Sequence, residues 1–270
     1  MRRIYLLLLV LALAICVAPA AAWAGSTLYA MDDATNSLYS INPNTLALTF
    51  VGSTGVNGDF GDLAYNPGSG TAYWIPGRGN DTLYTINLGT GAVTQVGMHG
   101  INDMFSLAYD PVTHQLYGDA TNGNFYSLNT STGAATLIGN NGVYPGGMTY
   151  NSTTGQLILT MAGGSGSFYS INPATGAATL LGSPGFLNDN GVAWDPALGV
   201  YFVDDWNGKL YEVNPSTWTY SIVSNLNGDP FDGIIDVSGG GGTTPEPGSL
   251  VLFGSGLLGV AAVVRRRLHL

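Results

Sequence analysis

The sequence predicts an all-β protein, a five-bladed β-propeller whose blades are four-stranded antiparallel sheets. The first observation is a repeat of the form Leu-Tyr-Ser-Ile-Asn, which occurs five times, at residues 38–42, 83–87, 125–129, 168–172 and 210–214. Its tyrosines are 42 to 45 residues apart, which is the length of one propeller blade. The second observation is the composition: 40 glycines, 11% aromatic residues and only 9% charged residues favour short strands and tight turns over helices.

A second series of segments marks the start of each repeat unit. It occurs at residues 63–66, 107–110, 148–151 and 192–195, and 234–236 occupies the fifth place. Each unit contains four short strands, shown best by 106–110, 115–119, 124–129 and 134–139. The residues just before the series are small, and we expect them to form the wall of a narrow ring: Asp62, Ser106, Gly147, Gly191 and Gly233.

The two ends of the repeat region predict a closed ring. The region begins with a second strand, 27–32, and the missing first strand of that blade is found at 232–237. Pairing of these segments would leave no long unpaired edge. A solenoid of stacked hairpins shares the repeat length, but it does not explain why the two ends complement each other. We therefore assign 25–237 to the propeller.

Residues 1–24 have the form of a secretory signal peptide, which is expected to be helical. Two arginines follow Met1, residues 4–17 are apolar, and Ala22 and Ala24 form a small-x-small cleavage site. The alternatives are an uncleaved anchor and a lipoprotein, the second disfavoured because the residue before Cys16 is not small. Cleavage removes this single cysteine, so the mature chain can form neither a disulfide nor a thiolate metal site.

The C-terminal residues carry a second targeting signal. A Gly-rich linker, 238–244, is followed by Pro245, Glu246 and Pro247, then by an apolar run, 248–264, and then by Arg265, Arg266 and Arg267. As a helix, the 17 residues of the run span roughly 26 Å, enough to cross a bilayer core. The arginines would hold the end of this transmembrane helix on the cytoplasmic side.

Segment 245–270 resembles the PEP-CTERM tail of exported proteins in Gram-negative bacteria. The resemblance implies export through the translocon, anchoring in the inner membrane at least for a time, and processing by an exosortase-type enzyme. It also implies a final location at the cell surface or in the extracellular matrix, because this processing system accompanies exopolysaccharide production. The alternative is a plain tail-anchored propeller, which gives no role to the Pro-Glu-Pro sequence.

The blade topology predicts two unlike faces of the disc. Turns such as 66–70 and 172–176 combine Asn, Pro and Gly in tight connections, and they share one face, called here the turn face. The loops between second and third strands share the opposite face with the blade-to-blade crossovers. This acidic face carries Asp32, Asp33, Asp59, Asp62, Asp81, Asp103, Asp119, Asp189, Asp204, Asp205, Asp229 and Asp232.

An acidic face of this kind excludes nucleic acid as a partner, because it repels phosphates. It would attract a basic partner or Ca²⁺. The candidate calcium ligands are Asp189, Asp204 and Asp205, since hard cations take carboxylate, amide and backbone oxygens and these aspartates lie in Asp-Asn-Gly sequences. The alternative is that the aspartates only form turns and keep a secreted surface soluble.

Catalysis has little support in the sequence, and we expect neither a catalytic residue nor an organic cofactor. His99 and His114 belong to opposite faces, and the sequence lacks a Gly-x-Ser-x-Gly elbow. The enzyme alternative is a propeller glycoside hydrolase or lyase that uses a pair of aspartates on the acidic face.

We favour a non-catalytic binding or structural module. Its acidic face, with Trp206, Tyr144 and Phe231, is expected to bind a polysaccharide, with or without a bridging cation, or a surface protein. A further aromatic set follows the inner strands and is expected to pack between blades rather than bind a ligand: Tyr65, Tyr109, Tyr150 and Trp194.

Overall fold

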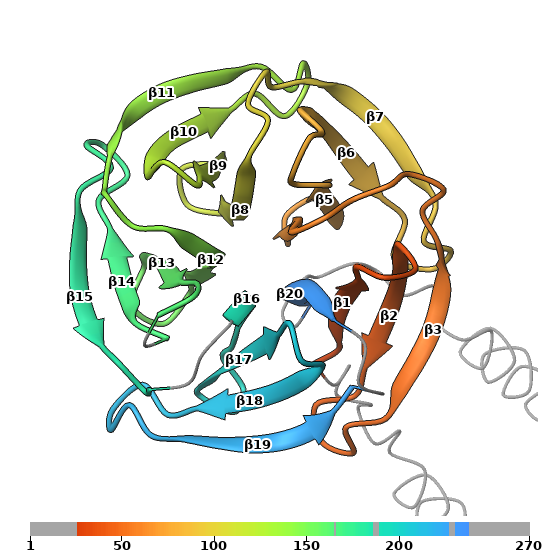
Figure 1. The fold of residues 1–270 in the computed structure, drawn as a ribbon, viewed down its shortest axis with the longest axis vertical. Coiled ribbons are helices and arrows are strands. Elements are labelled where there is room, and N and C mark those ends of the chain that lie inside the picture. Colours follow the sequence, from red (N-terminus) through yellow and green to blue (C-terminus); the bar gives the residue numbers. More distant parts are fainter. Residues whose placement is uncertain (1–25, 165, 186–188, 227–229, 238–270) are drawn as a thin grey trace, which may run out of the picture.

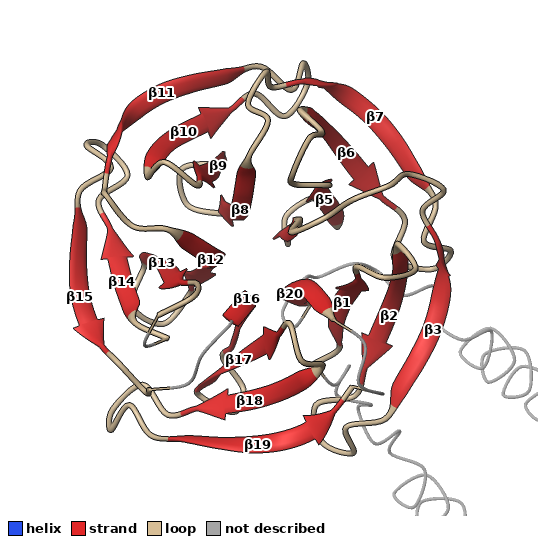
Figure 2. Ribbon diagram, viewed as in Figure 1, coloured by secondary structure: helices blue, strands red, loops and turns tan. Residues whose placement is uncertain are grey.

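A computed structural model shows five four-stranded sheets arranged in a closed ring, which confirms the predicted propeller (Figure 1). It describes residues 26–164, 166–185, 189–226 and 230–237. The regular structure in these ranges is β-strand throughout (Figure 2), and none of them contains a helix long and apolar enough to cross a membrane. The signal segment, the linker and the sorting segment lie outside the described residues.

In every blade the first strand lies at the centre of the ring and the fourth at the rim (Figure 1). The first blade contains β20 (Phe231–Asp236), β1 (Leu28–Asp32), β2 (Ser37–Ile41) and β3 (Leu48–Ser53). The second contains β4 (Asp62–Asn66), β5 (Thr71–Ile75), β6 (Thr82–Ile86) and β7 (Val93–Met98). The third contains β8 (Met104–Asp110), β9 (Gln115–Ala120), β10 (Asn124–Leu128) and β11 (Ala135–Asn140).

The fourth blade contains β12 (Pro145–Asn151), β13 (Gln156–Met161), β14 (Phe168–Ile171) and β15 (Ala178–Gly182). The fifth contains β16 (Asp189–Asp195), β17 (Val200–Asp205), β18 (Lys209–Val213) and β19 (Tyr220–Asn225). The ring closes as predicted, because β20 pairs antiparallel with β1, with Leu28 opposite Asp236 and Asp32 opposite Phe231. Both ends of the propeller therefore lie on the turn face.

The core lies between neighbouring blades. Tyr109 of the third blade stacks on Tyr73 of the second, with ring centroids 6.3 Å apart, and Trp194 of the fifth blade packs in one cluster with Ile158 of the fourth. Tyr65 packs against the cluster between the first and second blades, and Tyr150 packs against the cluster between the third and fourth blades. The expectation that this aromatic set packs between blades is confirmed.

Small residues allow the inner strands to touch backbone to backbone around the axis. A Cβ atom on Gly147 would lie 2.6 Å from the Cα of Gly191, and one on Gly191 would lie 2.7 Å from the Cα of Gly233. Gly233 also has a φ of 74° and would place a Cβ 2.7 Å from the Cα of Asp62. The narrow ring that the sequence predicted is thus formed, and at this level only glycine fits most positions.

Asp62 and Ser106 are the two residues of this ring that are not glycine, and the side chain of Asp62 ties three blades together. Its Oδ1 accepts the backbone N–H of Leu63 at 2.8 Å, and its Oδ2 accepts those of Leu107 at 2.8 Å and Met148 at 3.1 Å. These donors belong to β4, β8 and β12. The carboxyl group fills the space that the glycines leave, so the axis is closed at this level.

Candidate functional site

Four aromatic side chains gather on the acidic face and form what we call the aromatic platform: Phe60, Phe105, Tyr144 and Trp206. The ring of Phe60 lies at its centre, stacked on Trp206 with centroids 4.7 Å apart and on Phe105 with centroids 5.3 Å apart. Tyr144 meets Phe105 edge to face at 6.2 Å. These residues come from two crossovers, from β8 and from the β17–β18 loop, so the platform joins segments that are far apart in the sequence.

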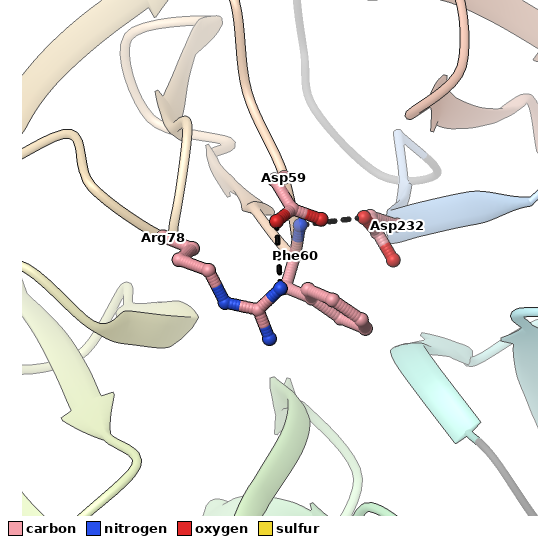
Figure 3. Close-up of polar contacts among 4 residues, drawn as sticks. All are labelled: Asp59, Phe60, Arg78 and Asp232. Carbon is pink, nitrogen blue, oxygen red and sulfur yellow. Dashed lines mark hydrogen bonds and ion pairs between the residues drawn. The ribbon is translucent and has the colours of Figure 1, made fainter.

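The backbone holds Phe60 in a conformation that an aromatic residue rarely adopts. Its φ is 61°, a left-handed value that costs free energy for any residue with a Cβ. The N–H of Phe60 donates to Oδ2 of Asp232 at 2.8 Å (Figure 3). On its other side, the Asp59 N–H donates to the Pro76 carbonyl at 2.8 Å. The surrounding structure therefore fixes the position of this ring, as expected for a binding residue.

Arg78 supports the platform from the β5–β6 loop. Its guanidinium carbon lies 4.5 Å from the centroid of the Phe60 ring, and its Nη1 donates to Oδ2 of Asp59 at 2.7 Å (Figure 3). A cation over an exposed aromatic ring contributes about 0.5–1 kcal/mol. The ion pair is half exposed, so it orients the arginine more than it stabilises the fold.

The outer members of the platform face solvent. Trp206 is 40% exposed and Tyr144 is 46% exposed, which is unusual for side chains of this size. Phe60 is only partly exposed and Phe105 is buried, so Trp206 and Tyr144 offer most of the apolar surface, with the Arg78–Asp59 pair beside it. The prediction that Phe231 joins Trp206 and Tyr144 on this surface is wrong. Phe231 is only 1% exposed and packs edge to face on Tyr39 inside the first blade.

The acidic face carries less surface charge than the sequence indicated, because many of its aspartates point inward. Asp32 illustrates the reason: its Oδ1 accepts the Thr35 N–H at 3.1 Å and its Oδ2 accepts the Thr35 hydroxyl at 2.8 Å. The buried members are Asp32, Asp62, Asp119, Asp204, Asp205 and Asp232. Asp103 is exposed and Asp33, Asp59 and Asp81 are partly exposed. The predicted solvated acidic surface is therefore corrected to a largely internal set of carboxyl groups.

Four of these carboxyl groups influence one another beside the platform: Asp33, Asp62, Asp204 and Asp232. Burial raises the pKa of Asp62 well above its usual range, and the charge of Asp204 adds to this effect. Burial also raises the pKa of Asp232 and of Asp33, whose carboxyl groups hydrogen-bond to each other. The negative charge of the partly exposed Asp33 raises the pKa of the buried Asp232 further, because a neighbouring like charge disfavours ionisation.

Two further buried groups have displaced pKa values. Burial raises the pKa of Asp119 to about 8, although its hydrogen bond from Asn141 opposes the shift. Burial lowers the pKa of His99 to about 4, and its Nδ1 accepts the Ile101 N–H at 3.2 Å. His99 lies in the crossover after β7 and His114 in the β8–β9 turn, on the opposite faces that were predicted for them.

The candidate calcium ligands occupy unlike positions. Asp205 caps its own loop: its Oδ1 accepts the N–H groups of Asn207 at 2.9 Å and Lys209 at 2.8 Å, and its Oδ2 accepts the Tyr211 hydroxyl at 2.7 Å. Asp204 is fully buried, and Asp189 pairs with Asp205 through the backbone. Within the described part of the chain, no group of three or more His, Cys, Asp or Glu side chains is arranged to hold a metal ion. Calcium binding at these residues stays a hypothesis from the sequence, and the hydrogen bonds that Asp205 already accepts count against it.

Sequence reasoning did not identify Phe60 and Phe105 as part of a surface. The available signal was Asp59-Phe60-Gly61, where an aromatic residue interrupts a polar crossover. Burial could not be read from that sequence, and neither could the positive φ. The sorting residues Pro245, Glu246, Pro247 and Arg265 to Arg267, and the cleavage residues Ala22 and Ala24, lie outside the described residues.

Comparison with protein families gives two matches. Residues 243–267 match the PEP-CTERM protein-sorting motif, which confirms the resemblance drawn from the tail and implies an exported, exosortase-sorted protein. Residues 10–108 match a domain of unknown function, DUF4394. A search of curated proteins gives no match.

Solved structures confirm the fold. A chain of the nidogen/laminin complex is similar, with a TM-score of 0.57 and 15% sequence identity over 79% of this chain and 81% of that one. A structural genomics protein of unknown function from Bacteroides thetaiotaomicron has a TM-score of 0.56 and 21% identity over 80% of this chain. The present chain covers 62% of that protein.

Proposed function

We propose that the processed propeller is a non-catalytic glycan-binding module of the cell surface or extracellular matrix, and that it binds polysaccharide through the aromatic platform. The sorting motif supports the location, because it implies an exported protein that is anchored in the membrane and then processed. The exposed ring of Trp206, held in place by its stack on Phe60, carries the proposal for binding. The C–H faces of a sugar ring pack on such a surface while its hydroxyl groups remain free for the polar rim.

The charges of the platform suit a neutral or weakly charged glycan. Arg78 is paired with Asp59, so the rim offers both a donor and an acceptor without a strong net field. The buried carboxyl groups beside the platform, Asp62 and Asp232, have pKa values raised by burial, so they ionise less readily than aspartates on the surface. A polysaccharide bridged by a cation would use the partly exposed Asp33 and Asp59, and a surface protein is the alternative partner.

Retention on the exopolysaccharide of the producing strain tests the proposal. In native gels that contain this polysaccharide, the wild-type protein should be retarded, and Trp206→Ala should migrate as it does in a gel without polysaccharide. Phe50→Ala is the matched control, since Phe50 is 58% exposed on β3 at the rim. Equal retardation of Trp206→Ala and the wild type would refute a role for the platform, provided that both proteins melt at similar temperatures.

A propeller glycoside hydrolase or lyase is the second candidate, favoured by the neighbouring carboxyl groups of Asp33 and Asp232, whose pKa values are both raised. Raised carboxyl pKa values are common in sites of acid catalysis. The cavity beside this pair has a volume of about 10 Å³, however, which leaves no room for a sugar ring. Release of reducing ends from the same polysaccharide, abolished in Asp232→Asn, would establish the enzyme; absence of release supports the binding module.

A further inference from the structure

The turn face contains a pocket at the axis, opposite the aromatic platform. Its volume is about 100 Å³, and all five blades contribute to its wall. The aromatic set of the inner strands, Tyr65, Tyr109, Tyr150 and Trp194, forms much of that wall, and Asp236 holds the equivalent position in the first blade. Prolines of the turns, such as Pro67 and Pro111, lie around it. The aromatic residues that pack between the blades therefore also line the axial pocket with part of their surface.

The pocket is closed at its inner end. Moving from the turn face toward the acidic face, the inner strands converge on the ring of Gly147, Gly191 and Gly233, which touch backbone to backbone. The carboxyl group of Asp62 completes that ring through bonds to three blades. A polymer cannot pass along the axis, so a ligand must enter and leave by the mouth on the turn face.

The wall combines apolar rings with neutral hydrogen-bonding groups. Burial raises the pKa of the Tyr65, Tyr109 and Tyr150 hydroxyl groups, so each remains a donor at neutral pH. The Nε1–H of Trp194 is buried and has no acceptor among the described residues, and a buried donor without a partner is costly. Thr149 and Ser152 add hydroxyl groups at the wall. Aromatic faces with a few polar groups are the usual lining of a small-molecule site.

We propose that this axial pocket binds a single neutral hexopyranosyl residue at the end of a glycan chain. A pyranose offers C–H groups to aromatic rings and hydroxyl groups to the tyrosines, to Thr149 and to the Trp194 indole. The closed inner end admits a terminal residue and excludes the middle of a chain. The one charged group of the wall, Asp236, repels a uronic acid. This site differs in face, residues and ligand segment from the aromatic platform, and it does not depend on that platform.

Saturation-transfer NMR on the protein isolated from its native cells tests the pocket. The probes are the methyl pyranosides of glucose, galactose, mannose and N-acetylglucosamine at millimolar concentration. At least one pyranoside should receive saturation from the wild-type protein. Its affinity for Tyr150→Ala should be about tenfold lower than for the wild type, a change of about 1.4 kcal/mol in binding free energy. Absence of transfer to all four probes would overturn the proposal.

Two further variants keep the result interpretable. Tyr150→Phe retains the ring and removes only the hydroxyl, so it tests the pocket even if Tyr150→Ala fails to fold; it should weaken binding by several fold. Trp206→Ala alters the opposite face and should leave pyranoside binding unchanged. Loss of binding in Trp206→Ala with full binding in Tyr150→Phe would assign the signal to the platform and refute the axial site.

The chain-end specificity has its own test. Short and long oligomers of the same glucan, compared at equal mass concentration, differ in the number of chain ends. Occupancy of the pocket should follow the molar concentration of ends and therefore be greater with the short oligomers. Equal occupancy at equal mass would show that internal residues bind, which contradicts a pocket closed at its inner end.

Discussion

Aspartate has two different tasks in this molecule, and single residues show both. Asp205 satisfies the backbone of its own loop and needs no partner from outside. Asp62 instead accepts N–H groups from three blades. One side chain therefore satisfies these backbone donors where the inner strands leave little room for water. The Asn-Gly after Asp205-Trp206 indicates a turn, whereas the role of Asp62 follows only from the long-range packing of three blades.

The carboxyl groups with raised pKa values predict that stability changes with pH. Asp119 has a pKa of about 8 in the folded protein against 3.8 as its usual value, so the folded state binds the proton more tightly. Stability from this group is fully present below its unfolded pKa and is lost as pH rises through about 8. His99, with its pKa lowered to about 4 from 6.5, opposes this trend only below pH 6.5.

We therefore expect the free energy of unfolding to increase as pH falls from 8 to 6.5. Asp119 alone should contribute on the order of 1 to 2 kcal/mol over that interval. Asp119→Asn keeps the volume and an oxygen for Asn141, so the variant should fold and show a shallower dependence on pH. Urea unfolding at several pH values measures this, and an unchanged slope in the variant would contradict the assignment.

Calcium gives a second prediction at the scale of residues. The carboxylate oxygens of Asp205 already accept four hydrogen bonds, and a cation bound there would have to compete with them. We expect the melting temperature in millimolar Ca²⁺ to equal that in a chelator. A rise of several degrees with calcium would show a ligand that binds the folded state, and substitution of Asp189, Asp204 and Asp205 in turn would then locate it.

At the scale of elements, the outer strand of one blade docks on a turn of the next. A Cβ on Gly52 would lie 1.9 Å from the Thr90 carbonyl oxygen, and one on Gly139 would lie 2.0 Å from that of Thr175. Gly97 meets Thr132 in the same way at 2.0 Å. Each pair joins a fourth strand to the turn between the third and fourth strands of the neighbouring blade, so the repeat encodes its own interface.

Gly139→Ala should therefore destabilise the propeller by about 2 kcal/mol or more, because overpacking against backbone cannot be relieved by a rotamer change. Gly89→Ala is the control. It lies in a turn of the same type, where Ser131 and Ala174 occupy the equivalent positions and donate the same N–H to the preceding Asn at 2.9 Å. We expect it to be neutral or stabilising by up to about 1 kcal/mol. Thermal unfolding compares the two, and similar melting temperatures would refute the docking argument.

The elements were also the most predictable level of this structure. The repeated Leu-Tyr-Ser-Ile-Asn segments gave the third strands, and the closing pair was found because 27–32 lacked a partner within its own repeat. Strand limits in the third blade agree within two residues, since predicted 106–110 became Met104–Asp110. The platform could not be predicted in the same way. Its contact between Phe60 and Trp206 depends on ring closure and on a positive φ, neither of which leaves a local pattern.

At the scale of the whole molecule, the two ends of the propeller determine how it is presented. β20 ends at Asp236 on the turn face, beside the axial pocket, and only residues 237–244 separate it from Pro245. Even fully extended, eight residues reach about 28 Å. We therefore predict that the turn face is the nearer one, and the aromatic platform the farther one, while the sorting tail remains in the membrane. Processing would release both faces.

Single-cysteine labelling tests this orientation, because Cys16 is the one cysteine of the sequence and the expected cleavage of the signal segment would remove it. Ser152→Cys places a thiol at the pocket, and Asp103→Cys places one on the acidic face; both positions are exposed. In exosortase-deficient spheroplasts, a bulky impermeant maleimide should label Asp103→Cys several-fold faster than Ser152→Cys. In processed protein the two rates should become similar. Equal rates in the anchored protein would mean that the linker lets the disc turn over freely, and the axial pocket would then be open to glycan before processing as well as after it.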